Sequence, residues 1–180
     1  MEKFYRRKDA LQFCSLLFIS IFSIFLCRCS HVLHSTGFYN DDYSPVEEIL
    51  GPINDARLTG KICGNKYYKP ASPVVWNDTL GQAALQHSLD MAQKGFLGHT
   101  GSDGRGLEER LSKVGYRWSS CGENVGQGFR TPEEAVRLWL KSEVHCKNIM
   151  NPDFKEAGVA FAKSGNRRSY WTLILGNSKQ

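Results

Sequence analysis

Apolar residues recur with helical spacing in four segments of the chain. The clearest is residues 78–94, where they fall on one helical face together with a histidine, at Leu80, Ala84, His87 and Met91. We expect this helix to begin with Asp78 as its capping residue and to end at Gly95. On its apolar face, His87 is expected to be a half-buried, hydrogen-bonded histidine rather than a metal ligand.

The other three helical segments are less regular or shorter. Residues 46–58 have helical spacing that Pro52 must disturb. Residues 107–114 form a short helix that ends at Gly115. A fourth helix opens at Thr131 with a capping box to Glu134, and its buried stripe is predicted to be Val136, Trp139 and Leu140.

Strands are predicted mainly near the end of the chain. Residues 156–163 and 168–175 alternate between apolar and polar positions, and the letters SGNR between them indicate a hairpin. Residues 116–129 are interpreted as a glycine-rich strand, and residues 63–73 as a loop. Because helices come first and strands come late and close together, the pattern favours the α+β class with a small antiparallel sheet.

The first 29 residues are predicted to be a targeting segment. Four basic side chains precede the apolar run of residues 11–27, which is the pattern of a signal peptide. The run is also nearly long enough for an uncleaved membrane anchor. Residues 30–45 are polar and aperiodic, so we expect a tether. In either case the folded part is expected to be secreted, periplasmic or in the cell envelope.

Composition and charge narrow the function further. The chain has 180 residues, is 41% hydrophobic and carries a formal net charge of +5. Residues 1–29 hold five basic and two acidic side chains, which is +3 of that total. The remainder shows no basic stripe of the kind that follows a nucleic-acid backbone, so nucleic acid is not an expected partner. We expect a monomer that reaches a membrane only through an uncleaved N-terminal segment.

Three cysteines lie beyond the targeting segment, at Cys63, Cys121 and Cys146. In an oxidising compartment two of them are expected to pair, which leaves one thiol over. Cys121 together with a histidine from elsewhere in the chain could also mimic a cysteine-protease pair. We rank that interpretation below a structural or spare thiol.

Four polar residues are candidates for chemistry: His99, Glu123, Glu143 and His145. His99 opens the glycine-rich stretch GHTGSDGRG, which follows a helix and therefore lacks the strand–loop–helix order of a phosphate-binding loop. From spacing alone the four residues fit either a metal site or a set of hydrogen-bonded histidines that hold loops in place. Arg110 is either the partner of a carboxylate in this region or a solvated side chain.

Several ordered motifs carry a resemblance to a known family. The stretches GFLGHTGSDG, EERLSKVGYRW, GENVGQG, TPEEAVRLWLKSEVHCKNIM and FKEAGVAF occur in that order. The chain resembles the CAP superfamily of cysteine-rich secretory proteins, antigen 5 and plant pathogenesis-related protein 1, and most of all its short bacterial branch. The resemblance covers residues 46–176 and assigns residues 46–180 to a CAP domain.

The resemblance implies a three-layer α-β-α sandwich and a cleft lined by histidines and acidic residues. By motif, His99 is the first cleft histidine, Glu123 the first glutamate and His145 the second histidine. Glu143 is a weaker cleft candidate, because it stands where bacterial members commonly have proline, and the change favours an extended helix here. The resemblance also implies a disulfide between Cys63 and Cys146, with Cys121 left free.

The family implies a module that binds a small or apolar ligand, such as a lipid, or an envelope or extracellular partner. We expect no cofactor to be required, although His99 and His145 with Glu123 can bind zinc weakly. One alternative is a metal-assisted peptidase or esterase that uses Glu123 as its base. Another is a structural envelope protein. We lean toward the non-enzymatic module.

Overall fold

The computed structural model describes residues 45–179. The predicted targeting segment, residues 1–29, and the tether up to residue 44 lie outside the described residues. Within the described part, none of the helices has the length and apolar character needed to span a membrane.

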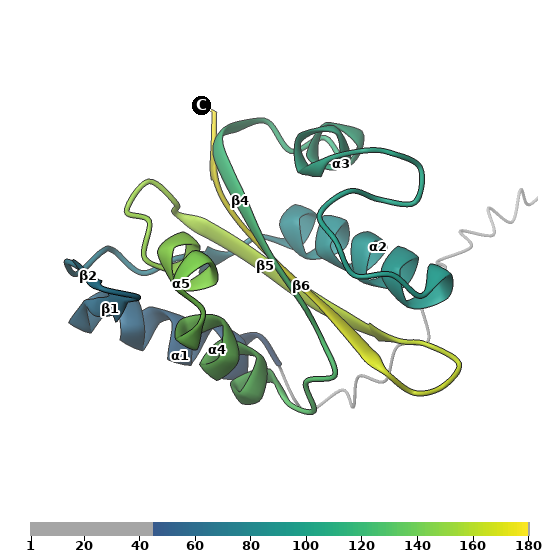
Figure 1. Cartoon of the computed structure of the whole chain (residues 1–180). Coiled ribbons are helices and arrows are strands. Elements are labelled where there is room, and N and C mark those ends of the chain that lie inside the picture. Colours follow the sequence, from purple (N-terminus) through teal and green to yellow (C-terminus); the bar gives the residue numbers. More distant parts are fainter. Residues whose placement is uncertain (1–44, 180) are drawn as a thin grey trace, which may run out of the picture. The chain divides into compact units, whose positions relative to one another are not determined.

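Two layers of helices enclose a central sheet (Figure 1). One layer contains α1 (Pro45–Thr59), α4 (Pro132–Lys141) and α5 (Glu143–Ile149). The other contains α2 (Asp78–Lys94) and the short α3 (Leu107–Lys113). The fold is therefore of the α+β class, as the pattern of elements predicted, and it is the α-β-α sandwich that the resemblance implied.

The central sheet has the strand order β3-β5-β6-β4. Its strands are β3 (Val75–Trp76), β4 (Trp118–Gln127), β5 (Glu156–Lys163) and β6 (Ser169–Ser178). The pairs β5–β6 and β4–β6 are antiparallel, as expected. The sheet is not wholly antiparallel, because β3 runs parallel to β5, with Val75 N donating to Lys155 O.

The segment expected to be a loop after α1 contains a small hairpin. Strands β1 (Lys61–Cys63) and β2 (Lys66–Tyr68) pair antiparallel as a separate two-stranded sheet. Strands of three residues are too short for an alternating pattern to be recognised in sequence. The disulfide between Cys63 and Cys146 joins this hairpin to α5, so the implied pairing is confirmed, with Cys121 as the free cysteine.

Two helix boundaries differ from the expectation. The capping residue of α2 is Asn77, whose side chain accepts from the Leu80 amide, while Asp78 instead accepts from the Trp76 indole at 2.7 Å. The segment after Trp139 does not extend α4, because Ser142 takes an extended conformation (φ −82°, ψ 125°) and a new helix, α5, begins at Glu143.

Apolar packing on both faces of the sheet places the helices. Sixteen buried residues, among them Trp139, Ile149 and Leu173, fill one core on the α1, α4 and α5 side. On the other side α2 packs closely on β5 at Gly158, where a Cβ atom would lie 2.1 Å from the Gly81 amide nitrogen. Gly158 therefore allows the close approach that aligns α2 with the sheet.

Arg57 of α1 is fully buried and connects three segments of backbone. Its guanidinium donates to the carbonyls of Ser72 at 2.7 Å, Ile149 at 2.6 Å and Phe154 at 3.0 Å, and to that of Asn151 at 2.9 Å. These acceptors include the C-terminal end of α5, where a helix carries partial negative charge. Burial lowers the pKa of Arg57.

Candidate functional site

The glycine-rich loop after α2 is held in a defined shape. Gly95 ends α2 in the left-handed conformation (φ 71°), which glycine adopts without strain. Farther along, Gly101 N donates to Arg105 O at 2.9 Å, and Ser102 N donates to the Asp90 carboxylate of α2 at 2.7 Å. The loop is therefore a fixed turn, and it carries His99 to the surface over β4.

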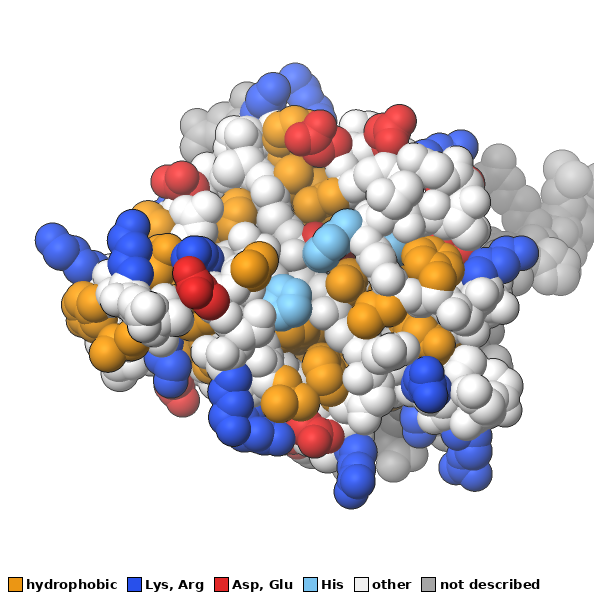
Figure 2. Space-filling view, in the orientation of Figure 1, with side chains coloured by type: hydrophobic (Ala, Val, Ile, Leu, Met, Phe, Trp, Pro, Cys, Tyr) orange, Lys and Arg blue, Asp and Glu red, His pale blue; other side chains and the backbone are white. Residues whose placement is uncertain are grey.

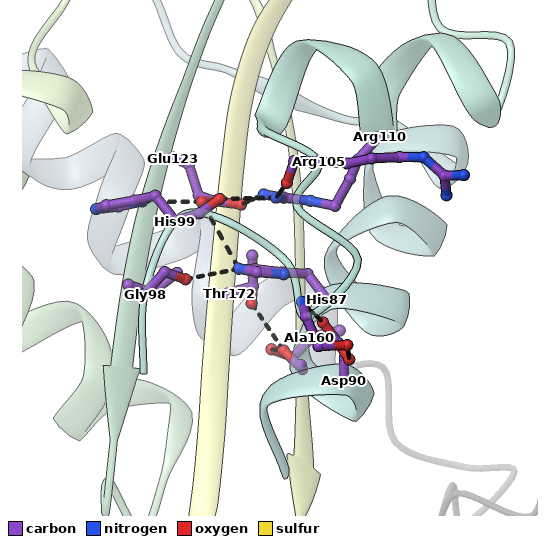
Figure 3. A network of polar contacts seen from close by, with 12 residues as sticks. His87, Asp90, Gly98, His99, Arg105, Arg110, Glu123, Ala160 and Thr172 are labelled. Carbon is purple, nitrogen blue, oxygen red and sulfur yellow. Dashed lines mark hydrogen bonds and ion pairs between the residues drawn. The ribbon is translucent and has the colours of Figure 1, made fainter. Parts of the chain in front are cut away.

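Glu123 of β4 lies beneath this loop at the centre of a polar network (Figure 3). Its side chain is only 3% exposed, yet both carboxylate oxygens are engaged. Oε1 accepts from His99 Nδ1 at 2.9 Å, and Oε2 accepts from Arg110 Nη2. Arg110 also donates to the carbonyl of His99 at 2.7 Å. Of the two interpretations of Arg110, the structure therefore shows the carboxylate partner.

The same contacts set the orientation and charge of His99. Because the carboxylate accepts at Nδ1, that nitrogen carries a proton and Nε2 is the free position of the ring. The imidazole is 59% exposed. The hydrogen bond to Glu123 raises the pKa of His99, against a smaller opposing effect of burial. Glu123 thus holds an exposed, basic imidazole in one orientation.

His87 of α2 approaches the same carboxylate oxygen as His99 (Figure 3). Its Nε2 donates to the Gly98 carbonyl at 2.8 Å and lies 3.9 Å from Glu123 Oε1. This bond confirms the expectation of a hydrogen-bonded histidine, but the expectation that His87 is half-buried is wrong. The side chain is fully buried, and among the described residues its Nδ1 has no hydrogen-bond partner. Burial lowers the pKa of His87, so we treat this ring as neutral.

His145 reaches the same region from α5. Two asparagines dock α5 on β4: Asn124 donates to the His145 carbonyl at 3.0 Å, and Asn148 donates to the Glu123 carbonyl at 3.0 Å. The pKa of His145 is lowered by burial and then by the charge of His99. Figure 2 shows histidine side chains gathered near the middle of one face, with a carboxylate recessed beside them and apolar side chains around them.

Glu143 is directed elsewhere, which corrects its assignment to the cleft. Its carboxylate accepts from Lys147 at 2.6 Å, one turn farther along α5. It also lies against Gly64, the turn of the β1–β2 hairpin, where a Cβ atom would meet the carboxyl group. Glu143 is the first residue of α5, and from this first turn its side chain is directed toward the hairpin. His145 lies two residues farther along the helix.

The fit of a metal ion to this site is poor. In residues 45–179 no three side chains of His, Cys, Asp or Glu are arranged to hold a metal. Nε2 of His99 is free to act as a ligand, and His145 is a second imidazole nearby. Glu123, the third ligand expected from sequence, is neutralised by Arg110 and occupied by His99.

Cys121 is half-buried on β4, two residues before Glu123. Burial raises the pKa of its thiol, and Glu108 and Glu123 raise it further. A thiol rather than a thiolate is a poor nucleophile, so the arrangement does not favour cysteine-protease chemistry.

Sequence reasoning missed part of this network. His87 is expected from sequence only as a half-buried histidine on the apolar face of its helix, whereas it is bonded to Gly98 in the loop that carries His99. Asn124 and Asn148 were not singled out, and asparagines on a strand and a helix give no distinguishing signal. Only the contacts between β4, α5 and the loop reveal their positioning role.

A family model matches most of the chain. Residues 50–175 match the Cysteine-rich secretory protein family, CAP. Two curated relatives come from Bacillus subtilis (strain 168). The uncharacterized protein YkwD is 36% identical over 100 residues, which are 56% of this chain and 38% of YkwD. The uncharacterized membrane protein YlbC is 30% identical over 97 residues, 54% of this chain and 27% of YlbC. The matches thus span well under half of either relative.

Solved structures share the fold. An outer surface protein from Borrelia burgdorferi aligns with a TM-score of 0.64 at 18% identity, over 75% of this chain and 93% of that chain. An extracellular protein containing a SCP domain from Bacillus anthracis aligns with a TM-score of 0.57 at 22% identity, over 74% of this chain and 40% of that chain. At these identities the likeness concerns the fold.

Proposed function

Because this chain belongs to the cysteine-rich secretory protein family, we propose that it is an exported, non-enzymatic module that binds a small apolar ligand, such as a lipid, through the His99–His145 cleft. Export accords with the disulfide and with similar structures described as an outer surface and an extracellular protein.

The observation that carries the binding proposal is the composition of the surface around His99 and His145. Leu97, two residues before His99, and Val144, next to His145, are both large exposed apolar side chains. The imidazole of His99 offers a polar group in an orientation fixed by Glu123, and His145 adds a second imidazole from α5. Apolar walls with few, well-placed polar groups are typical of ligand sites.

The test is to identify what the chain carries and whether the cleft holds it. The full chain is purified, extracted with organic solvent and analysed by mass spectrometry, beside a Leu97→Ser/Val144→Ser variant. We expect an apolar compound that approaches one per chain in the wild type and is strongly depleted in the variant. Leu89→Ser, which changes an exposed leucine on α2, is the matched control.

Added fatty acids of graded chain length provide a second measurement, because a site that was emptied during purification will still bind them. If the wild type neither carries a compound nor binds these fatty acids, or if the cleft variant retains the compound fully, the binding proposal is wrong and a structural envelope role takes its place.

A hydrolase is the second candidate, and the exposed, oriented imidazole of His99 is the observation that favours it. A base bound by a buried carboxylate recurs in hydrolytic enzymes. The expected role of Glu123 as the base does not fit the contacts, because Arg110 and His99 occupy both of its oxygens. If hydrolysis occurs, His99 Nε2 is the group placed to accept a proton.

Turnover of casein and simple esters by the wild type and by His99→Gln distinguishes the two candidates. We expect no turnover above background in either protein, since the nearby Cys121 is held as a thiol by its raised pKa and is therefore a poor nucleophile. Turnover by the wild type that His99→Gln abolishes would establish the hydrolase instead.

A further inference from the structure

The β1–β2 hairpin presents an apolar outer face that the cleft does not use. Ile62 and Tyr67 are directly opposite each other in the antiparallel register, so both side chains point to the same side. Ile62 is 66% exposed and Tyr67 is 56% exposed. Leu58, at the end of α1 just before the hairpin, is 55% exposed. Large apolar side chains thus gather at this end of the molecule.

The hairpin cannot turn this face inward, because its inner face is already packed. Side chains alternate along each strand, and the alternate positions Cys63 and Tyr68 contact the core. The disulfide from Cys63 to Cys146 fixes the hairpin to α5. The ring of Tyr67 also lies against Gly60, where a Cβ atom would come within 2.5 Å of its hydroxyl oxygen. The exposure of Ile62 and Tyr67 is therefore a fixed feature.

Basic side chains stand behind this face. Lys61 and Lys66 occupy the alternate strand positions, on the side opposite Ile62 and Tyr67, and Lys66 Nζ lies 5.2 Å from the ring centroid of Tyr68. Lys61, Lys66 and Lys69 are exposed, and in the described part of the chain none of them forms an ion pair with a carboxylate. The nearby carboxylate of Glu143 is neutralised by Lys147. Figure 2 shows apolar atoms ringed by Lys and Arg side chains at the end of the molecule where Figure 1 places β1 and β2.

We propose that the β1–β2 hairpin is a docking surface for a membrane that contains anionic lipids. Ile62 and Tyr67 enter the boundary between headgroups and acyl chains, and the lysines behind them contact lipid phosphates in the shallower headgroup layer. The long lysine stems lie along apolar surface while their ammonium groups stay in the polar layer. A hairpin of two three-residue strands is too small for a typical stable protein interface, whereas a lipid surface requires no shape complementarity.

A local fluorescence probe in the full chain tests the docking surface. The variant Ile62→Trp is mixed with vesicles whose acyl chains are brominated and quench indole on contact. One set of vesicles is phosphatidylcholine alone, and the other is phosphatidylcholine mixed with phosphatidylglycerol. The signal of the parent chain is subtracted in each case. Any attachment through residues 11–27 does not by itself bring the indole at position 62 into the lipid.

We expect the anionic vesicles, and not the phosphatidylcholine vesicles, to quench most of the emission of the tryptophan introduced at position 62. High salt, or the added changes Lys61→Gln/Lys66→Gln/Lys69→Gln, should restore that emission. Leu89→Trp on α2, in the other helix layer, is the matched control and should keep its emission. Tyr67→Trp probes the same face independently. No quenching in either hairpin variant, equal quenching of the α2 variant, or quenching that the lysine changes leave intact would each overturn the proposal.

Discussion

Nδ1 of His99 and Oε1 of Glu123 lie 2.9 Å apart, and they join an exposed imidazole to a buried carboxylate. Both residues were expected in one site from sequence, but their bond was not. Through this hydrogen bond, Glu123 holds the His99 ring in one orientation. Nε2 is then the ring nitrogen of His99 that is available to react.

The histidines are predicted to titrate in a fixed order. The pKa of His99 should lie above the ordinary value of about 6.5 and that of His145 below it. Histidine titration by NMR measures both values. In Glu123→Gln the pKa of His99 should fall, because the charged acceptor is lost. A His145 pKa above that of His99 would contradict the electrostatics described for the site.

The same shifts predict that the domain loses stability in mild acid. His87 and His145 have lowered pKa values, so below about pH 6.5 the unfolded chain binds protons that the folded state does not, and the free energy of unfolding falls. His99 acts in the opposite sense: its contribution is fully present below about pH 6.5 and is lost as pH rises through its raised pKa. Because His87 is fully buried, we expect its effect to dominate. Urea unfolding near pH 5 and pH 7 measures the difference in the free energy of unfolding between the two pH values. The variant His87→Gln should reduce this difference. An unchanged difference would show that other groups cause it.

Two arginines of one region should differ greatly in their effect on stability. Arg110→Met leaves the buried Glu123 carboxylate without its cation, and we expect a loss of about 3–5 kcal/mol. Arg105→Met breaks an exposed pair with Asp103 and should cost at most about 1 kcal/mol. Chemical denaturation of both variants tests this; equal losses would mean that Arg110 has no special role.

Replacing Arg57 should destabilise the domain by several kcal/mol. Arg57→Met leaves four backbone carbonyls without their donor, and each buried unsatisfied group costs about 1–3 kcal/mol. Arg57→Lys should recover only part of the loss, because one ammonium group cannot reach all three segments. The free energy of unfolding in urea is the measurement, and a fully stable Arg57→Met variant would contradict the role given to this side chain.

Removal of the disulfide should cost about 2–5 kcal/mol, because it closes a long loop with a sequence separation of 83. The comparison is Cys63→Ala/Cys146→Ala with the wild type by thermal and urea unfolding. Cys121→Ser, which removes the free thiol, is the control and should be close to neutral. Peptide mapping without reductant should link Cys63 to Cys146, and a link to Cys121 would refute the pairing.

Because His99 and Arg110 occupy the Glu123 carboxylate, any zinc binding should be weak and should depend on His99 and His145 alone. It should also weaken as pH falls through the histidine range, because imidazole must be unprotonated to act as a ligand. Isothermal titration of the wild type, His99→Ala and His145→Ala tests this. Both substitutions should abolish binding. Unchanged affinity in both variants would exclude these imidazoles as the ligands.

Some elements of this protein follow from short-range sequence signals. The apolar spacing of residues 78–94, together with Gly95, is enough for α2 because helix periodicity and the glycine stop are local. The alternation around the SGNR turn likewise predicts β5 and β6. The capping residue was off by one, because Asn77 and Asp78 are chemically alike and only the contact of Asp78 with the Trp76 indole separates them.

Tertiary packing decided the site. The sequence alone identified His99, Glu123 and His145 through motifs, but it also included Glu143, whose direction depends on how α5 begins. Arg110 and His87 come to Glu123 from 13 and 36 positions away along the chain. Their roles arise because a buried carboxylate must find partners wherever the fold places them, and those partners are set by the packing of α2, α3 and β4 rather than by any local pattern.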